Sequence, residues 1–140
     1  MDLVESSYRL TQGFPNSELY GLVSQIRRAA VSVPANIAEG YVRESTREYL
    51  QHLSIAQGSL GELETHFEIA ARLAFLSPGD LQALLEAISS LRKQLFKLRD
   101  AIARKLELTP DSRLPTPAKP PTPDSRLPTP AKPPAPGSRL

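Results

Sequence analysis

The segment from residue 17 to residue 39 carries apolar residues at the spacing of one helical face. At about 100° per residue, Arg28 and Glu39 fall opposite this face, as they do in a helix that is buried on one side. Pro34 has no N–H and its ring crowds the preceding turn, so we expect a kink near this residue. We expect Gly40 to end the helix as its C-cap. The residues of the buried face are Leu19, Leu22, Val23, Ile26, Ala29, Ala30, Val33 and Ile37.

A second helical stripe follows, with apolar residues at alternating steps of four and three. Ser45 or Thr46 is placed to cap this helix. A heptad pattern of this length predicts helix-on-helix packing with a left-handed crossing. Gly58 and Gly61 lie inside the stripe, where each costs about 1 kcal/mol relative to alanine. We expect a neighbouring helix to approach closely there, and a ligand crevice is the alternative. The stripe consists of Tyr49, Leu53, Ala56, Leu60, Leu63, Phe67, Ala70 and Ala74.

A third stripe begins after the turn Ser77-Pro78-Gly79-Asp80, which places a proline near the first helical position. Its core positions again alternate by four and three residues, and four further apolar residues widen it. Arg92 and Arg99 fall within the widened arc, one heptad apart. They either lie at its edge with their head groups in water, or contact another subunit and pair with carboxylates such as Glu62 or Glu68. The core positions are Leu84, Ile88, Leu91, Leu95, Leu98 and Ile102, and the widening residues are Leu81, Leu85, Phe96 and Leu106.

The N-terminal segment predicts a short helix over residues 2 to 12. The sequence Gly13-Phe14-Pro15-Asn16-Ser17 then indicates a stop and a turn. Asn16 or Ser17 can cap the next helix, and Glu18 in its first turn is favourable to the helix dipole. The apolar and aromatic residues of the short helix are Leu3, Val4, Tyr8 and Leu10.

The composition changes at Thr109, since eleven of the fourteen prolines lie after this residue. The thirteen residues from Thr109 to Pro121 are repeated without change from Thr122 to Pro134. Proline at this density excludes helix and sheet, so we expect a disordered, partly polyproline II tail over residues 109–140. A tolerated extension, a ligand for a proline-recognition domain and an electrostatic arm for RNA are the alternatives. Its evenly spaced basic residues are Arg113, Lys119, Arg126, Lys132 and Arg139.

The charge of the chain is divided unevenly between these two parts. Residues 1–108 carry 12 Lys and Arg against 13 Asp and Glu, and the tail carries 5 against 2. Because the predicted domain is near neutral, phosphate binding would need a local basic patch and not a global excess. Cysteine is absent, which rules out disulfides and thiolate zinc sites. No secretory signal or run of about 20 apolar residues is visible, so we expect a cytoplasmic protein.

The chain lacks the residue patterns of common catalytic and metal sites. A di-metal site in a helical bundle needs Glu-x-x-His pairs on two helices, but His52 and His66 lie about 21 Å apart on one helix. Glu48 and Glu62 precede them by four residues, a spacing that favours surface pairs along the helix. No Gly-rich phosphate loop, nucleophile elbow or serine triad is present. We therefore expect no enzyme, no cofactor, no metal and no small-molecule substrate.

Basic side chains remain as candidates for function. Lys93, Lys97 and Arg104 lie within about 40° of one another on the last helix, so they form a stripe. A solvated helix face is the alternative explanation of such a stripe. Asn36 and Glu39 suit structural roles better, in satisfying the backbone that the proline frees and in capping neighbours. The candidate phosphate contacts are Arg27, Arg28, Arg43, Arg47, Lys93, Lys97 and Arg104.

One stretch of the chain resembles the 23S rRNA intervening sequence proteins, a family of four-helix bundle proteins. The motif runs from Gln25-Ile26-Arg27-Arg28-Ala29 through Ser32-Val33-Pro34-Ala35-Asn36-Ile37-Ala38-Glu39-Gly40. Flanking matches lie at Phe14-Pro15 with Glu18-Leu19-Tyr20-Gly21-Leu22 and at Ser59-Leu60-Gly61-Glu62-Leu63-Glu64-Thr65, so the resemblance covers roughly residues 3 to 106. Family members usually have a longer segment ahead of this point. The first helix therefore looks truncated, or the true start lies upstream of Met1.

The resemblance implies an assembly and a partner that periodicity alone would not give. Relatives are similar to ring-forming homo-oligomers, often pentamers. One branch is similar to the accessory proteins of diversity-generating retroelements, which bind a reverse transcriptase and nucleic acid through a basic surface. A second apolar strip, which flanks Arg27, is compatible with a subunit interface. The interface candidates are Tyr20, Val31, Ala38, Arg92 and Arg99.

These patterns predict an all-α protein, with an antiparallel up-down-up-down four-helix bundle over residues 1–108 and a disordered Pro-rich tail over 109–140. The leading hypothesis for function is a non-catalytic homo-oligomer that associates with RNA or DNA, or with a nucleic-acid enzyme. The alternative is a protein-interaction adaptor without nucleic-acid binding. Neither hypothesis involves a membrane.

Overall fold

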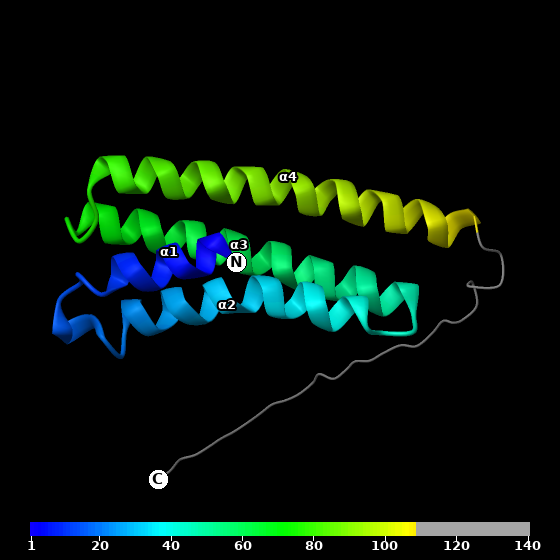
Figure 1. The fold of residues 1–140 in the computed structure, drawn as a ribbon, viewed down its shortest axis with the longest axis horizontal. Helices are drawn as coiled ribbons and strands as arrows, with labels where there is room; N and C mark the ends of the chain where they lie inside the picture. The colour runs from blue at the N-terminus through cyan, green and yellow to red at the C-terminus, as the bar shows by residue number, and fades with distance from the viewer. Residues whose placement is uncertain (109–140) are drawn as a thin grey trace, which may run out of the picture. The chain divides into compact units, whose positions relative to one another are not determined.

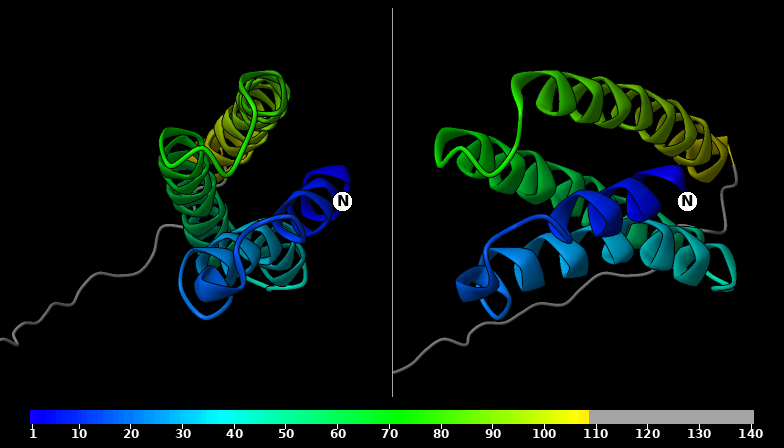
Figure 2. Two further views of the ribbon diagram at one scale, coloured as in Figure 1. Left: turned by 90° about the vertical axis from the view of Figure 1, so that its left-hand side faces the viewer. Right: turned by 60° about the vertical axis from the view of Figure 1, so that its left-hand side comes forward.

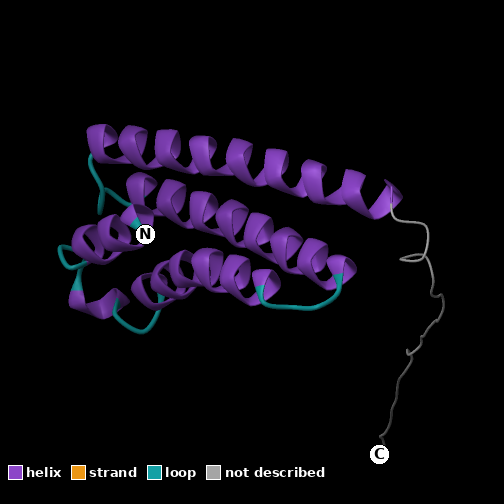
Figure 3. Cartoon of the chain, turned by 45° about the vertical axis from the view of Figure 1, so that its right-hand side comes forward, coloured by secondary structure: helices purple, strands orange, loops and turns teal. Residues whose placement is uncertain are grey.

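A computed structural model describes residues 1–108, and these residues form four α-helices and no strand. The elements are α1 (Asp2–Thr11), the 3-10 helix η1 (Asn16–Glu18), α2 (Leu22–Tyr41), α3 (Thr46–Arg72) and α4 (Pro78–Leu108). Successive α-helices run in opposite directions (Figure 1), and loops join them (Figure 3). None of the described helices has the length and apolar character that crossing a membrane requires. The predicted all-α, up-down-up-down bundle is confirmed, whereas the predicted tail over 109–140 lies outside the described residues.

Helix α3 supplies the centre of the hydrophobic core. Seen end-on in Figure 2 (left), α3 lies between α2 and α4, and α1 lies beside α2. Six apolar side chains of the predicted α3 stripe have no exposed surface. Tyr49 packs against this core at its edge, whereas Ala74 lies beyond the end of the helix and is exposed. The six buried residues are Leu53, Ala56, Leu60, Leu63, Phe67 and Ala70.

Helix α4 buries its predicted core positions, but one of the four residues predicted to widen its stripe is exposed. Phe96, which we expected to widen the stripe, is 66% exposed. At about 100° per residue, Phe96 lies beyond Arg92 and away from the buried positions. Phe96 is therefore outside the buried arc of α4, whereas Leu81 packs against the core and Leu85 and Leu106 are half-buried. Leu84, Ile88, Leu95 and Ile102 are buried, and Leu91 and Leu98 pack against the core.

The predicted starts of the two longest helices are confirmed by side-chain caps. Ser45 Oγ accepts a hydrogen bond from the backbone N–H of Glu48 at 3.3 Å. Ser77 Oγ accepts one from the backbone N–H of Asp80 at 3.1 Å. Pro78 is the first residue of α4, where its missing N–H leaves no helical hydrogen bond unmade.

Helix α2 begins later than its apolar pattern indicated. Helix η1 forms at the predicted start instead, so Asn16 and Ser17 do not cap α2. The carboxylate of Glu18 accepts a hydrogen bond from the backbone N–H of Leu22 at 3.3 Å and takes the capping role. Leu19, predicted on the buried face, consequently precedes the helix and is 45% exposed.

Gly40 lies inside the last turn of α2. The prediction that it is the C-cap of this helix is wrong, because Val42 is the C-cap. The helix continues through Pro34 to Tyr41, and no glycine in residues 1–108 has a positive φ. A Cβ added to Gly40 would lie 2.8 Å from Cβ of His52 and 3.0 Å from Cδ1 of Tyr49. Helices α2 and α3 therefore approach closely at Gly40, and a larger residue does not fit there without a shift.

Gly58 and Gly61 do not mark a close approach of helices, in contrast to the prediction. A Cβ built on either residue meets no atom within 4 Å in the described part of the chain. Gly58 is exposed and Gly61 is half-buried. The cost of glycine at these two positions is not offset by packing inside residues 1–108.

Helix α1 is short and is held partly by polar groups. Leu3 is buried, as its spacing predicted. Ser7 and Thr11 are also buried, which apolar periodicity did not indicate, and each hydroxyl donates to the backbone carbonyl four residues earlier at 2.7 Å. Met1 lines a small cavity with residues from the middle of α2 and α4. Helix α1 therefore covers only part of the length of its neighbours.

The turn between α3 and α4 is held by backbone hydrogen bonds and an aromatic pair. The N–H of Phe75 donates to the Ala70 carbonyl at 2.9 Å, and the N–H of Ala74 donates to the Ala71 carbonyl at 3.0 Å. These are the two bonds of a Schellman motif, and Ala74 adopts the left-handed conformation that it requires, with φ 65°. The rings of Phe75 and Phe14 lie 5.6 Å apart between centroids, which ties this turn to the loop after α1.

We expect Gly40→Ala to lower the free energy of unfolding by about 1 to 2 kcal/mol. The added methyl group overpacks the contact with His52, and the gain in helix propensity of about 1 kcal/mol offsets only part of this cost. Gly58→Ala is the matched control, because its methyl group meets open space and the same propensity gain raises stability by up to about 1 kcal/mol. Urea denaturation followed by circular dichroism measures both. Shifts of equal sign and size would contradict the close approach at Gly40.

Candidate nucleic-acid interface

Two lysines and a phenylalanine share one outward face of α4. Lys93 and Lys97 lie one helical turn apart, about 6 Å along the axis, and Phe96 lies beside them. With Arg92 and with Gln57 of α3, these side chains line an open hollow of about 450 Å³. We refer to Arg92, Lys93, Phe96 and Lys97 as the α4 basic patch. The phenyl ring and the aliphatic stems of the cations give this hollow an apolar surface beneath positively charged groups.

The charges of Lys93 and Lys97 are not neutralised within the part of the chain that the structure describes. Both side chains are exposed, and neither makes an ion pair or hydrogen bond with another described residue. Arg104, predicted to extend their stripe, instead pairs with Asp100, with Nε and Oδ2 3.1 Å apart. The predicted stripe of three cations is therefore a pair of available lysines and an arginine with its own acidic partner.

Arg92 and Arg99 attach α4 to α3 of the same chain. Arg92 Nη2 lies 2.7 Å from Glu64 Oε1. Arg99 Nε donates a hydrogen bond to Ser54 Oγ at 3.0 Å. Both arginines are half-buried at the edge of the α4 stripe. Arg92 thus pairs with Glu64 of its own chain. The sequence had suggested Glu62 or Glu68 as carboxylate partners.

Arg27 connects α2 to α1, whereas its neighbour Arg28 is exposed. Arg27 Nε donates to Thr11 Oγ1 at 3.0 Å, and its Nη2 donates to the backbone carbonyl of Tyr8 at 3.4 Å. Its guanidinium carbon lies 4.6 Å from the centroid of the Tyr8 ring, a cation–π contact. Arg28 makes no ion pair or hydrogen bond with the described residues. The fold therefore uses the donors of Arg27 and leaves those of Arg28 available.

Arg43 and Arg47 lie near the connection between α2 and α3. Arg43 Nη2 pairs with Oε2 of Glu39, one helical turn earlier, and Arg47 is exposed. The predicted basic residues thus occupy four separate places: the start of α2, the α2–α3 connection, the middle of α4 and, for Arg104, the C-terminal part of α4. Within residues 1–108, only the α4 basic patch sets two unpaired predicted cations one turn apart.

The predicted interface residues of α2 belong to an exposed apolar face. Val31 is 41% exposed, and Ala38, one heptad later, is exposed as well. Ala35 and Val42 extend this face, and Val42 is 73% exposed. Tyr20 is 92% exposed, but it lies in the turn ahead of α2 and not on the helix. We refer to Val31, Ala35, Ala38 and Val42 as the α2 apolar face.

A chain of side-chain hydrogen bonds crosses the contact between α2 and α3. Ser32 Oγ and Ser59 Oγ lie 2.7 Å apart, and Asn36 Nδ2 donates to both Oγ and the carbonyl of Ser32 at 2.9 Å. Asn36 Oδ1 lies 3.1 Å from Nδ1 of His52. Because the amide NH₂ faces the serine, its oxygen faces the ring, and Nδ1 of His52 carries the proton. We call these four residues the polar ladder. The polar ladder agrees with the structural role predicted for Asn36. Its amide donates to the carbonyl of Ser32, however, and not to that of Ala30, which lacks a helical donor because Pro34 has no N–H.

The two histidines serve separate contacts on α3. His52 contacts Asn36 and does not form the predicted surface pair with Glu48. His66 does pair with Glu62, with Nε2 and Oε2 3.6 Å apart, but its side chain is mostly buried and both ring nitrogens lack a hydrogen bond to any described residue. No group of three His, Cys, Asp or Glu side chains in residues 1–108 is arranged to hold a metal ion.

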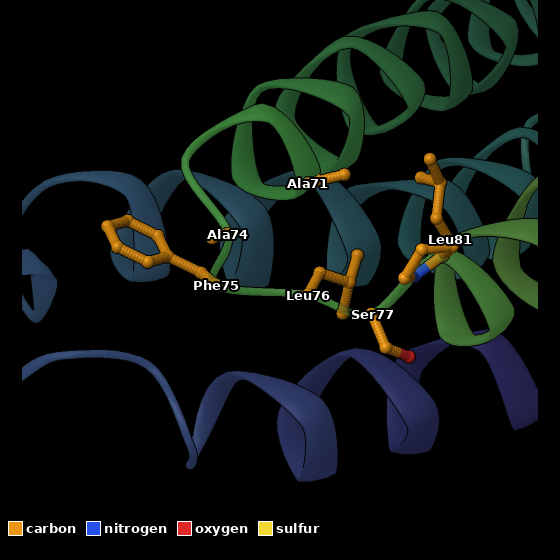
Figure 4. Close-up of a pocket in the computed structure, with 7 residues that line it drawn as sticks. Ala71, Ala74, Phe75, Leu76, Ser77 and Leu81 are labelled. Carbon is orange, nitrogen blue, oxygen red and sulfur yellow. The ribbon is translucent and has the colours of Figure 1, made fainter.

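A second hollow, of about 560 Å³, lies at the turn between α3 and α4 (Figure 4). Its one side-chain hydroxyl, that of Ser77, already accepts the capping hydrogen bond from Asp80. Its lining therefore offers neither an acid–base pair nor an activated nucleophile. The lining residues are Ala71, Ala74, Phe75, Leu76, Ser77, Pro78 and Leu81.

Phe96 is the member of the α4 basic patch that the sequence pattern missed. Its apolar side chain led us to expect that it widens the buried stripe of α4. The angular position was the available signal, since at about 100° per residue Phe96 lies about 60° from Lys93 and about 100° from Leu95. On the helical wheel Phe96 thus lies between the half-buried Arg92 and the exposed Lys93, and the rotation of α4 against its neighbours decides which of the two it joins.

Comparison with known protein families gives a match over most of the chain. A family model described as 23S rRNA-intervening sequence protein matches residues 1–97. The matched range contains α1, α2, α3 and the part of α4 that carries the α4 basic patch. A search of curated proteins found no match.

We expect Arg27→Gln to lower the free energy of unfolding by about 1 to 2 kcal/mol, because the variant loses the hydrogen bond to Thr11 and the contact with the Tyr8 ring. Arg28→Gln removes the same charge from the adjacent exposed position, and we expect its effect to stay within about 0.5 kcal/mol. Thermal or urea unfolding measures both variants. If they unfold alike, Arg27 does not hold α1 to α2.

Proposed function

Because the chain belongs to the 23S rRNA-intervening sequence protein family, we propose that it is a non-catalytic, oligomeric four-helix bundle module that associates with RNA or other nucleic acid. The observation that carries the proposal is the pair of lysines, Lys93 and Lys97, exposed on α4 without a partner among the described residues. Such cations attract phosphate oxygens, and contact with them releases counterions from the nucleic acid. The family description names an rRNA, which makes RNA the first ligand to test.

The near-neutral charge of residues 1–108 is compatible with this proposal because the charges are unevenly placed. Arg92 and Arg104 on α4 have acidic partners, whereas Lys93 and Lys97 have none in the described chain. Local cations of this kind support contact with a small number of phosphates. The expected interaction is therefore of moderate affinity and strongly dependent on salt.

A binding role suits the chemistry of these residues better than catalysis does. The hydroxyls of Ser32 and Ser59 are hydrogen bonded to each other, at the end of the polar ladder away from His52. The sequence contains no cysteine. Neither of these two hydroxyls therefore has beside it a histidine that could act as its base, which the common covalent mechanisms need.

We also propose that the chain forms a homo-oligomer, with a pentameric ring as the first arrangement to test. The α2 apolar face supports this proposal, since contiguous exposed apolar surface marks contact sites on soluble proteins. The pentamer itself comes from the family resemblance. The same resemblance makes a nucleic-acid enzyme, such as a reverse transcriptase, the protein partner to test.

A protein-interaction adaptor without nucleic-acid binding is the second candidate function. The α2 apolar face favours it, because Val31, Ala35, Ala38 and Val42 offer a contact surface without charge. Salt separates the two candidates. Phosphate contacts weaken steeply as ionic strength rises, whereas an apolar contact does not.

We expect the double variant Lys93→Gln/Lys97→Gln to weaken RNA binding and to flatten its dependence on salt. Each lost phosphate contact on a single strand reduces the slope of log affinity against log salt by about 0.7, so two contacts change it by about 1.4. Fluorescence anisotropy with a short labelled RNA, measured from about 50 to 200 mM salt, gives this slope.

The matched control for the lysines is Arg9→Gln/Arg72→Gln, which removes the same net charge from two exposed positions outside the patch. All variants are full-length, so the basic residues of the tail contribute equally to each measurement. Equal slopes for the two double variants would show that binding follows net charge, and the α4 basic patch would not be the site.

Light scattering on the freshly purified protein tests the assembly, and we expect a multi-subunit mass. The sequence has no tryptophan, so carried nucleic acid would dominate the ultraviolet absorbance until high salt removes it.

Val31→Glu/Ala38→Glu is expected to lower the mass of the assembly, because it buries two unpaired carboxylates in the contact between subunits. The control, Ala83→Glu/Ser90→Glu, adds the same charge to exposed positions of α4 and leaves the mass unchanged. A monomeric unmodified protein would contradict the oligomer.

A further inference from the structure

Phe96 is an apolar ring held open to solvent in the middle of a helix. Its side chain is 66% exposed, whereas Phe14 and Phe67 are buried in the core. A phenylalanine has no polar atom with which to engage water, so its exposure is unfavourable in the isolated chain. The ring is available to stack against a flat partner.

The surroundings of Phe96 are cationic. Arg92 and Lys93 lie one turn before it and Lys97 follows it, and all four residues line one hollow with Gln57. Arg92 is fixed by Glu64 at 2.7 Å, so its guanidinium is held in place at the edge of this hollow. Lys93 and Lys97 have no such partner in residues 1–108, and at about 100° per residue both lie on the side of Phe96 that faces away from the buried positions. A flat apolar surface beside two unpaired cations matches a ligand with a flat apolar part next to anionic groups.

We propose that the α4 basic patch binds unpaired nucleotides of RNA, with one base stacked on Phe96 and neighbouring phosphates at Lys93 and Lys97. This inference rests on the proposed association with nucleic acid and adds that the ligand is single-stranded. A base in a duplex already stacks on its neighbours, and the major groove of duplex RNA is too narrow for side chains to read. Stacking of an unpaired base on an aromatic ring tolerates any base, so little sequence preference follows.

A tryptophan at position 96 tests the stacking directly, because the chain has no other tryptophan. In Phe96→Trp, titration with single-stranded oligouridine is expected to quench the indole fluorescence, and the same strand paired in a duplex is expected to quench it much less. Ile69→Trp is the matched control, since this α3 position is 42% exposed and lies outside the α4 basic patch. Equal quenching of both reporters, or equal quenching by strand and duplex, would overturn the proposal.

The variants Phe96→Ala and Phe96→Tyr separate stacking from charge. Loss of one base stack should weaken binding of the single strand roughly fivefold to a hundredfold in Phe96→Ala, and tyrosine should restore it. The ring carries no charge, so the salt slope should stay that of the unmodified protein, unlike the slope of Lys93→Gln/Lys97→Gln. An unchanged affinity in Phe96→Ala would overturn the inference.

The outcomes distinguish this inference from the function on which it rests. If the unmodified protein binds RNA through the two lysines but Phe96→Ala binds equally well, only the stacking is wrong. If the unmodified protein binds no RNA at low salt, both proposals fail. The exposed ring could instead contact a second copy of the chain, and light scattering on Phe96→Ala tests this alternative. A mass lower than that of the unmodified protein would place Phe96 in a subunit contact and would overturn the proposal that it stacks on a base.

Discussion

The close contact between α2 and α3 is the constraint on which the rest of the bundle depends. At Gly40 no methyl group fits between α2 and Cβ of His52. From this point the polar ladder continues through Asn36 to Ser32 and Ser59. Apolar stripes can slide past each other with little change in burial, but a partly buried polar group that loses its partner costs about 1 to 3 kcal/mol. The ladder therefore selects one register and one rotation of the two helices.

The other two helices are attached to this pair by arginines at its edges. Arg27 of α2 contacts Thr11 and Tyr8 of α1, and Arg92 of α4 pairs with Glu64 of α3. This use of arginine follows its chemistry, since a planar guanidinium can make several directed hydrogen bonds and stack on a ring at once. Lysine holds a compact, strongly hydrated charge on a flexible stem. Lys93 and Lys97 are thus left to solvent and to ligands, because Arg27 and Arg92 supply the inter-helix cations described above.

The sequence predicted the helices, their order and the core because heptad spacing and serine caps such as that at Ser45 are local signals. It could not predict features set by contacts between helices. A glycine can end a helix or can let a second helix approach closely. The residues that flank Gly40 and Gly58 in the sequence do not indicate which of these roles each glycine has. His52 has a glutamate at pairing distance along its own helix, yet the asparagine of α2 lies nearer. Phe96 was misplaced because the width of a buried stripe depends on how its helix is rotated against its neighbours.

The position of the polar ladder also bears on the order in which the chain can fold. Its cross-helix hydrogen bonds join residues 16 and 27 positions apart, across the short connection between α2 and α3. Closing a loop of this size costs little entropy, and local contacts of this kind favour rapid folding. The middle of the chain can therefore form the contact between α2 and α3 while both ends are still unfolded. Helix α1, although synthesised first, then adds to a surface that its successors have built.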